Sequence, residues 1–172
     1  VVKATLMAAS AERSGIYTIN PDATGESLFP NIPLNAFRPS WSPDGSKLAF
    51  QFRNGSENEI SVINADGTGL LKIAGNVSSF NQRITWSPGG AHIAFIGEGD
   101  GQHPETMRAV SFANTDGSGT YRLPVSPTLL TAVDWSPDGS RFVYATDREL
   151  FVMNADGSGQ TQLTTIQQTP DG

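Results

Sequence analysis

The residues best suited to acid–base chemistry are the two histidines, since a chain without cysteine has no thiolate chemistry. His103 stands close to Asp100 and Glu105 in the segment 97–108, where a general base with a carboxylate to orient it is conceivable. However, the sequence has no Gly-x-Ser-x-Gly elbow, and no nucleophile stands out. We therefore expect a protein that is not an enzyme.

Metal binding is weakly indicated. His92 occupies the strand position that Lys47 and Arg141 fill in similar segments, which predicts an exposed strand residue. The Asn-Ala-Asp-Gly segments resemble fragments of calcium loops but lack the succession of carboxylates and the final glutamate. We expect no metal ion and no cofactor, and weak calcium binding by 97–101 stays open.

Two arginines and one aspartate precede tryptophans. Arg38 and Arg83 each stand three residues before a tryptophan, and Asp134 stands directly before the third. Strand alternation would place them at a central channel, where an arginine can bind an anion or the terminal carboxylate of a peptide. A structural arginine–aspartate network across the channel is an equally open alternative.

These residues belong to a repeated unit. Trp-Ser-Pro-Asp-Gly occurs at 41–45 and 135–139, and Trp-Ser-Pro-Gly-Gly at 86–90. Each copy continues with a short apolar strand, a loop, a second strand and a turn of the type Asn-x-Asp-Gly. The tryptophans stand 45 and 49 positions apart, and units of this length with about four short strands are typical of propeller blades. Proline and glycine in these segments favour tight hairpin turns.

The two chain ends resemble parts of one unit. The segment 164–172 is similar to 131–139, while the N-terminal segment looks like a unit without its first strand. We expect an all-β propeller with four blades of about four antiparallel strands, one blade being completed by both termini. Within one domain, the predicted blades are 166–172 with 1–30, 36–75, 80–124 and 130–165. The termini could also pair between two chains, so a monomer and a homodimer through the termini are both open.

Composition excludes several partners. A net charge of −6 and a pI near 4.7 argue against nucleic acid, because affinity for phosphate comes mostly from lysine and arginine. No apolar run approaches the ~20 residues that span a bilayer, so we expect no membrane insertion.

The loops that differ between the copies are the better candidates for recognition, because what all copies share is most simply structural. They are the connections between units and the long loop 97–108. Aromatic and arginine side chains in these loops are the types that interface cores favour. The expected binding residues are Phe37, Arg38, Phe80, Asn81, Arg83, His103, Glu105, Arg108, Leu129, Leu130 and Asp134.

With these motifs in view, the sequence resembles the TolB-like propeller repeats, a branch of the WD-repeat-like propellers. The resemblance rests on Trp-Ser-Pro-Asp-Gly followed by Asn-Ala-Asp-Gly and covers nearly the whole chain. It implies a periplasmic or extracellular binding scaffold, or a propeller domain attached to a peptidase. We expect a noncatalytic scaffold that binds a protein or peptide through its variable loops. The alternatives are the propeller of a larger hydrolase and a carbohydrate-binding propeller, for which Phe80 with Asn81 would be the platform.

Overall fold

The computed structural model describes residues 4–7, 15–75, 77, 84–98, 108–123 and 130–164, with the backbone alone at 4–7, 98 and 108. Among these residues no helix could cross a membrane. The strands are β1 (Ala4–Met7), β2 (Ile16–Ile19), β3 (Ser27–Leu28), β4 (Ala36–Trp41), β5 (Lys47–Asn54), β6 (Glu57–Asn64), β7 (Leu71–Ala74), β8 (Thr85–Trp86), β9 (His92–Glu98), β10 (Arg108–Asn114), β11 (Thr120–Arg122), β12 (Leu130–Trp135), β13 (Arg141–Thr146), β14 (Leu150–Asn154) and β15 (Thr161–Gln162).

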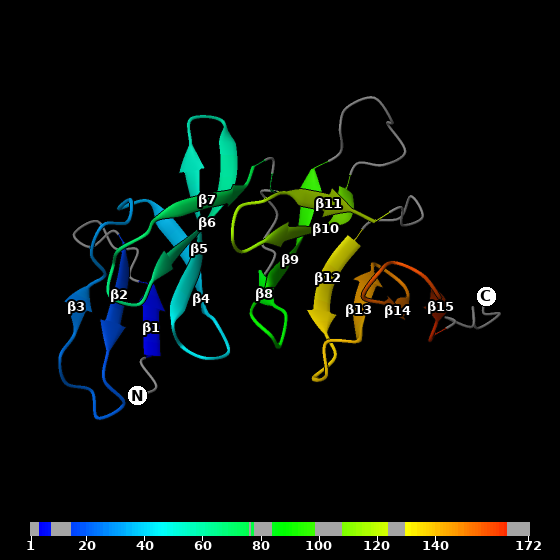
Figure 1. The fold of residues 1–172 in the computed structure, drawn as a ribbon, viewed down its shortest axis with the longest axis horizontal. Coiled ribbons are helices and arrows are strands. Elements are labelled where there is room, and N and C mark those ends of the chain that lie inside the picture. Colours follow the sequence, from blue (N-terminus) through cyan, green and yellow to red (C-terminus); the bar gives the residue numbers. More distant parts are fainter. Residues whose placement is uncertain are drawn as a thin grey trace, which may run out of the picture.

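The strands form four separate antiparallel sheets. The first sheet is β1–β2–β3, and the second, third and fourth contain β4 to β7, β8 to β11 and β12 to β15 in chain order. In each of them, strands that follow one another in the chain are neighbours in the sheet. The sheets stand side by side in a row, as Figure 1 shows. This arrangement confirms the predicted all-β fold, built from antiparallel sheets of the propeller type.

The repeated motif lies at equivalent places in the second, third and fourth sheets. The innermost strands β4, β8 and β12 end on Trp41, Trp86 and Trp135. A hydrogen bond from the glycine N–H to the serine carbonyl closes each of the three following turns, at 2.8 to 2.9 Å. The Trp86 indole N–H also donates to the carbonyl of Ser40 in the preceding sheet, 3.0 Å away. The motif therefore closes hairpins, and in the third sheet its tryptophan also bonds to the neighbouring sheet.

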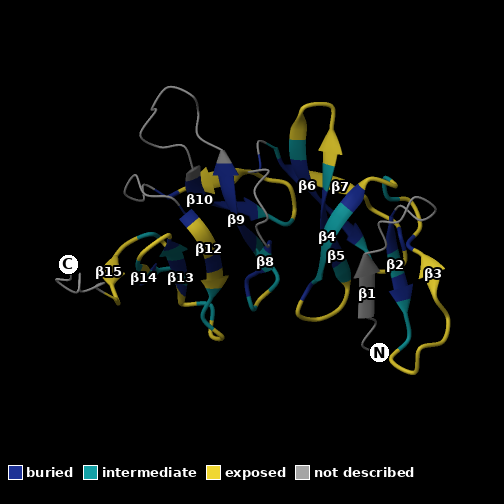
Figure 2. Ribbon diagram, turned by 180° about the vertical axis from the view of Figure 1, so that it is seen from behind, coloured by how far each residue is buried: buried dark blue, intermediate teal, exposed yellow. Residues whose placement is uncertain are grey.

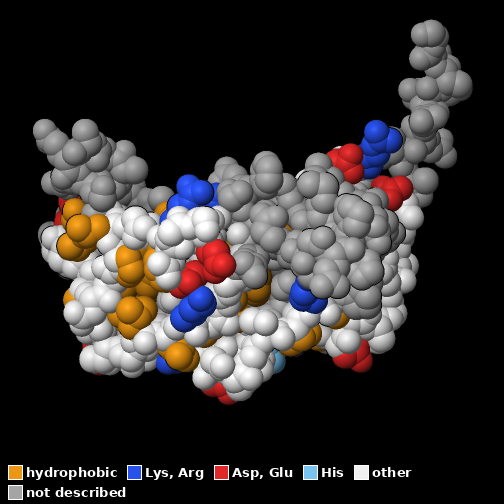
Figure 3. Space-filling model, turned by 90° about the horizontal axis from the view of Figure 1, so that it is seen from above, with side chains coloured by type: hydrophobic (Ala, Val, Ile, Leu, Met, Phe, Trp, Pro, Cys, Tyr) orange, Lys and Arg blue, Asp and Glu red, His pale blue; other side chains and the backbone are white. Residues whose placement is uncertain are grey.

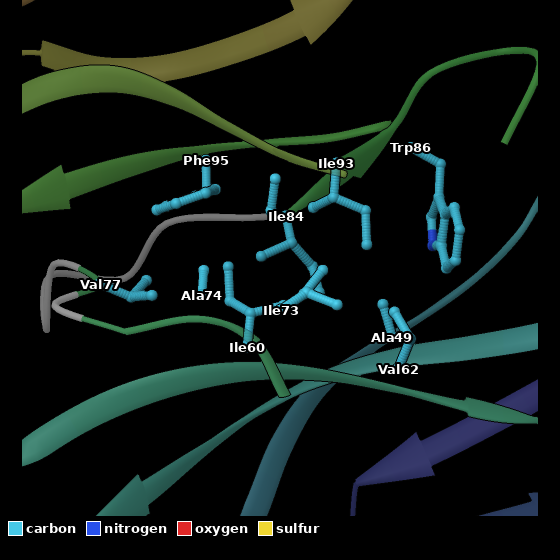
Figure 4. Packing of buried hydrophobic residues seen from close by; sticks show 11 residues of the cluster. Ala49, Ile60, Val62, Ile73, Ala74, Val77, Ile84, Trp86, Ile93 and Phe95 are labelled. Carbon is cyan, nitrogen blue, oxygen red and sulfur yellow. The ribbon is translucent and has the colours of Figure 1, made fainter. Parts of the chain in front are cut away.

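The hydrophobic core is divided into three clusters, one between each pair of neighbouring sheets. Between the second and third sheets, Ile60, Val62 and Ile73 face Ile84 and Ile93 (Figure 4). Similar clusters join the first sheet to the second and the third to the fourth. Buried residues accordingly run along the strands where sheets meet, as Figure 2 shows. Each sheet is too thin to bury its own faces, so it gains a dry interior only by stacking on a neighbour.

The predicted closure of a four-bladed ring by both termini is wrong for this structure. Within the described part of the chain, the first sheet contains β1, β2 and β3, and it lies at the opposite end of the row from the fourth sheet (Figure 1). The residues 165–172, which were expected to complete it, lie outside the described residues. The repeat period identifies each blade, but the angle between blades depends on the packing of each cluster. Here four blades form an open arc.

Candidate functional site

One end of the sheets carries the two kinds of repeated turn, and we call it the turn end. The turns between β4 and β5, β8 and β9, and β12 and β13 lie at the bottom of Figure 1. Backbone bonds join each to the second turn of its sheet. The N–H of Ala65 donates to the carbonyl of Ser46 at 2.8 Å, and that of Ala155 to Ser140 at 2.9 Å. The turn end is therefore cross-linked within each sheet.

Aspartates of the Ser-Pro-Asp-Gly turns bond to the serines beside them. Ser42 Oγ donates to Asp44 Oδ1 at 2.6 Å, and the N–H of Ser46 donates to the same atom at 3.0 Å. Ser136 and Ser140 make the same bonds to Asp138. These hydrogen bonds lower the pKa of both carboxyl groups from 3.8 to about 2. The carboxylates are thus ionised and are already used by the turn.

The Asn-x-Asp-Gly turns use their aspartates in the same way. Asp66, Asp116 and Asp156 each accept the N–H of the residue two positions later, at 2.8 to 2.9 Å. Hydrogen bonds from the side chain and then the backbone of that residue lower the pKa of each. This geometry confirms the interpretation of these aspartates as turn caps.

His92 also serves the turn end. Its Nδ1 lies 2.9 Å from Oδ1 of Asn114, the first residue of the second turn. Asn114 uses its Nδ2 to donate to Ser118, so we assign the proton of this bond to His92 Nδ1. The equivalent Lys47 Nζ donates to Asn64 Oδ1 at the same distance. His92 is therefore a structural residue at the start of a strand.

The opposite end carries the loops that differ between the sheets, and we call it the variable end. Arg38 is its most unusual residue, because it has a φ of 52° within a bulge of β4. Its Nη1 donates to Oε1 of Gln51 at 3.0 Å, and its Cζ lies 5.2 Å from the centre of the Phe37 ring. Partial burial lowers the pKa of Arg38. The guanidinium is held in place by a buried amide and a half-buried aromatic ring.

A second charged group lies on the same sheet. The carboxylate of Glu59 is buried and accepts hydrogen bonds from Lys72 Nζ at 2.6 Å and from Asn54 Nδ2 at 3.2 Å. The bond from Lys72 lowers the pKa of Glu59, and Lys72 itself is half exposed. Figure 3 looks onto the variable end and shows acidic side chains directly beside basic ones. This end thus presents anchored charges of both signs.

The sheets, the three shared clusters and the repeated turns agree with a comparison of the sequence with known families. Residues 3–168 match the TolB beta propeller domain. The chain belongs to the TolB beta propeller domain family. Among solved structures, this TolB-family propeller is similar to the putative TolB from Agrobacterium tumefaciens, with a TM-score of 0.67 and 19% identity over 93% of the chain.

Two further solved structures, both of larger proteins, contain a similar fold. The TolB-family propeller is similar to a chain of the nidogen/laminin complex, with a TM-score of 0.63 and 15% identity over 86% of its residues. It is also similar to an acylaminoacyl peptidase, with a TM-score of 0.60 and 17% identity over 87% of its residues. The chain spans 59% of the putative TolB, 54% of the nidogen/laminin chain and 28% of the peptidase. At these identities the likeness shows the fold alone.

The expected binding residues that the structure describes lie in different parts of the TolB-family propeller. Phe37 and Arg38 lie together at the variable end. Leu130 is fully buried in the cluster between the third and fourth sheets, which assigns it to the core instead of a binding surface. Asp134 is exposed and accepts hydrogen bonds from Thr85 Oγ1 at 2.8 Å and from the N–H of Trp135 at 2.9 Å. Asp134 therefore links β12 to β8, the innermost strand of the third sheet, by a hydrogen bond.

The remaining expected residues are not placed. Phe80, Asn81, Arg83, His103, Glu105 and Leu129 lie outside the described residues, as does the side chain of Arg108 at the start of β10. Sequence reasoning missed Gln51, Glu59 and Lys72. A signal was present for Gln51, because the other copies of its strand carry Ile96 and Ala145 at that position. A polar residue in place of an apolar one marks a buried hydrogen bond.

An open pocket of about 460 Å³ lies at the turn end of the TolB-family propeller, between the third and fourth sheets. Its lining includes His92, Tyr121, Trp135 and Asp138. His92 Nδ1 and the carboxylate of Asp138 are engaged in hydrogen bonds at the turns. Within the described ranges, no three histidine or acidic side chains gather closely enough to hold a metal ion. The variable end is therefore the stronger candidate for recognition.

Proposed function

We propose that this TolB-family propeller is a noncatalytic scaffold that binds a protein or peptide at its variable end. The observation that carries the proposal is the left-handed conformation of Arg38. A backbone conformation of this kind costs about 1–3 kcal/mol in a residue other than glycine, and such costs concentrate at functional sites. Gln51 and Phe37 hold the guanidinium, so it can receive a carboxylate of the partner with little loss of conformational freedom.

A free carboxyl terminus is the ligand group that we assign to Arg38. A guanidinium donates two parallel N–H bonds to a carboxylate, and Phe37 offers an apolar surface beside it. The nidogen/laminin structure supports a propeller of this fold in a protein complex, because it is a complex of nidogen and laminin. From the family we also infer a periplasmic or extracellular location, which cell fractionation with an antibody would test.

The experiment is a titration of short peptides that carry either a free or an amidated carboxyl terminus, measured by fluorescence anisotropy. Arg38→Gly removes the guanidinium while keeping a residue that favours positive φ. We expect the variant to bind the free-carboxylate peptides at least about tenfold more weakly. The control is Arg53→Ala, which removes an exposed arginine near the same end. Equal binding of both peptide forms, or unchanged binding by Arg38→Gly, would reject the carboxylate site.

A second candidate is the propeller domain of a larger hydrolase. Its support is the similarity to the acylaminoacyl peptidase, of which this chain spans 28%. In that case the variable end would contact a catalytic domain of the same polypeptide. Sequencing the whole coding region decides between the two, since a hydrolase domain beside these residues would favour this candidate.

A further inference from the structure

The pocket at the turn end, between the third and fourth sheets, is lined by residues that differ from their counterparts in the other repeated units. Its third-sheet side includes Gly89, Ala91 and His92, from the turn between β8 and β9 and the start of β9. Both other copies of this turn carry an aspartate, a serine and a basic residue at these positions: Asp44, Ser46 and Lys47 in the second sheet, and Asp138, Ser140 and Arg141 in the fourth. The three departures of the third sheet from the repeat therefore line one pocket.

A fourth departure in the same pocket is Tyr121 in β11, whose counterparts are Leu71 in β7 and Thr161 in β15. Each of the three pairs with the residue two positions before the asparagine of its turn. The Tyr121 ring stacks on Phe112, with the ring centres 4.9 Å apart, and lies 6.4 Å from the His92 ring at an angle of 84°. Stacking covers one face of the Tyr121 ring, while 38% of the residue stays exposed. Tyr121 and His92 therefore bring two aromatic rings to the pocket.

Neither the backbone nor the packing requires a glycine at position 89. Gly90 has a positive φ of 72° but Gly89 does not, and a Cβ on Gly89 would meet nothing within 4 Å. An aspartate could therefore stand here as Asp138 stands in the fourth sheet, where the serines of the turn hold it. The glycine instead leaves this side of the pocket open and uncharged. Space for a ligand explains this departure better than folding does.

The fourth-sheet side of the pocket is negatively charged through Asp138 and Asp156. Hydrogen bonds, first from the side chain of Ser136, lower the pKa of Asp138 to about 2, and bonds from Ser158 lower the pKa of Asp156. The hydroxyl of Ser140 donates to both oxygens of Asp138, and that of Ser158 donates to Oδ1 of Asp156. Among the described residues that line the pocket there is no lysine or arginine. The pocket thus combines aromatic rings and negative charge with carboxylates that already accept hydrogen bonds.

We propose that this pocket binds a small organic molecule that carries a quaternary ammonium group, such as trimethylammonium. A cation of this kind is attracted by the faces of aromatic rings and by carboxylates, yet it has no N–H to donate. It therefore needs negative charge more than free acceptors, and Asp138 and Asp156 supply that charge. The volume of about 460 Å³ lies in the usual range of small-molecule pockets, ~300–1,000 Å³. This site is separate from the peptide site proposed at Arg38.

Titration of the 172-residue chain with choline, followed through its backbone amide signals by nuclear magnetic resonance, tests the proposal. We expect the signals of Gly139 and Ala155, which line the pocket, to shift and saturate. The comparison ligand is the neutral carbon analogue of choline, in which a tert-butyl group replaces trimethylammonium. It should bind about fivefold more weakly or worse, because it lacks the charge. Equal binding of the two ligands would overturn the proposal, as would unshifted signals at both residues.

Variants with matched controls locate the site. Tyr121→Leu introduces the residue of the second sheet and should weaken choline binding about fivefold, whereas Tyr121→Phe keeps the ring and should change it less than about twofold. Asp156→Asn should weaken binding about threefold, while Asp66→Asn, in the same turn of the second sheet, should leave it unchanged. Far-UV circular dichroism checks that the variants fold. Unchanged choline binding by Tyr121→Leu rejects the pocket, whatever the peptide titration of Arg38 shows.

Discussion

The turn end and the variable end of the second sheet use polar residues in different ways. At the turn end, Asp44 and Asp66 accept hydrogen bonds from neighbours two positions away, and the same pattern recurs in the fourth sheet. At the variable end, Arg38 reaches Gln51, thirteen positions along the chain, and Lys72 reaches Glu59 at the same separation. The local bonds of the Asn-x-Asp-Gly turns recur in the second, third and fourth sheets, whereas the Arg38–Gln51 and Lys72–Glu59 bonds of the variable end lie in the second sheet.

This difference explains why recognition is placed at the variable end. A turn that satisfies its own carboxylate leaves few polar atoms for a partner and tolerates little change, because the turn holds a hairpin. A side chain held by a residue on another strand is fixed in position, and Arg38 is only partly buried. Sequence variation between copies can then alter the ligand without altering the blade.

The largest loss of stability is expected when a glycine at the turn end is changed to alanine, compared with a glycine at the variable end. Gly67 has a φ of 83° at the turn end, and a Cβ there would lie 2.5 Å from Pro30 Cγ. We expect Gly67→Ala to lower the free energy of unfolding by about 3 kcal/mol, through strain and overpacking. Gly55 has a φ of 62° in the variable-end hairpin with nothing within 4 Å of a Cβ, so Gly55→Ala should cost only about 1 kcal/mol. Urea unfolding measures both, and equal costs would contradict the comparison.

An intermediate effect is expected from the lysines. Lys72→Met leaves the buried carboxylate of Glu59 without its cation, so the free energy of unfolding should fall by about 1 kcal/mol. At the turn end, Lys47 donates to the neutral Asn64, so Lys47→Met should change stability less. The double variant Lys72→Met with Glu59→Gln should recover part of the loss in urea unfolding. No recovery would mean that the pair does not act as a unit.

The smallest expected change concerns pH. The pKa values of Asp44 and Asp138 fall from 3.8 to about 2 on folding, so their contribution to stability is complete above pH 4. It is lost as the pH falls from about 4 to about 2, because protonation removes an acceptor that the folded turn uses. Changing both residues to Asn should weaken the dependence of the urea unfolding midpoint on pH over this window. Asp147→Asn, outside the turns, serves as the control, and a similar flattening by it would contradict the assignment.

Much of the fold could be predicted because the turns are local. The Ser-Pro-x-Gly segments close hairpins through bonds between residues three positions apart, which the sequence displays directly. The positions of Trp41, Trp86 and Trp135 followed from these turns. Their indole bonds could not be predicted. Trp86 reaches the preceding sheet, while the buried Nε1 atoms of Trp41 and Trp135 have no hydrogen-bond partner among the described residues. Such bonds depend on the angle between sheets, which no local motif specifies.

The site was harder to predict for the same reason. Arg38 was identified from its place before a tryptophan, and Phe37 as an aromatic residue of a variable loop. The bulge in β4 that turns Arg38 toward Gln51, however, depends on pairing with β5. Leu130 looked like a loop residue and is instead the first residue of β12, where the third sheet covers it. Loop boundaries shift by a residue or two in sequence reasoning, and such a shift turns an exposed anchor into a buried one.

The division of the core into three clusters, each shared by two adjacent sheets, has a consequence for how such a chain changes over evolutionary time. Duplicating or deleting one unit alters a single junction and leaves the others with the neighbours they already had. The number of blades can thus vary among descendants while the loops of the other blades are inherited intact.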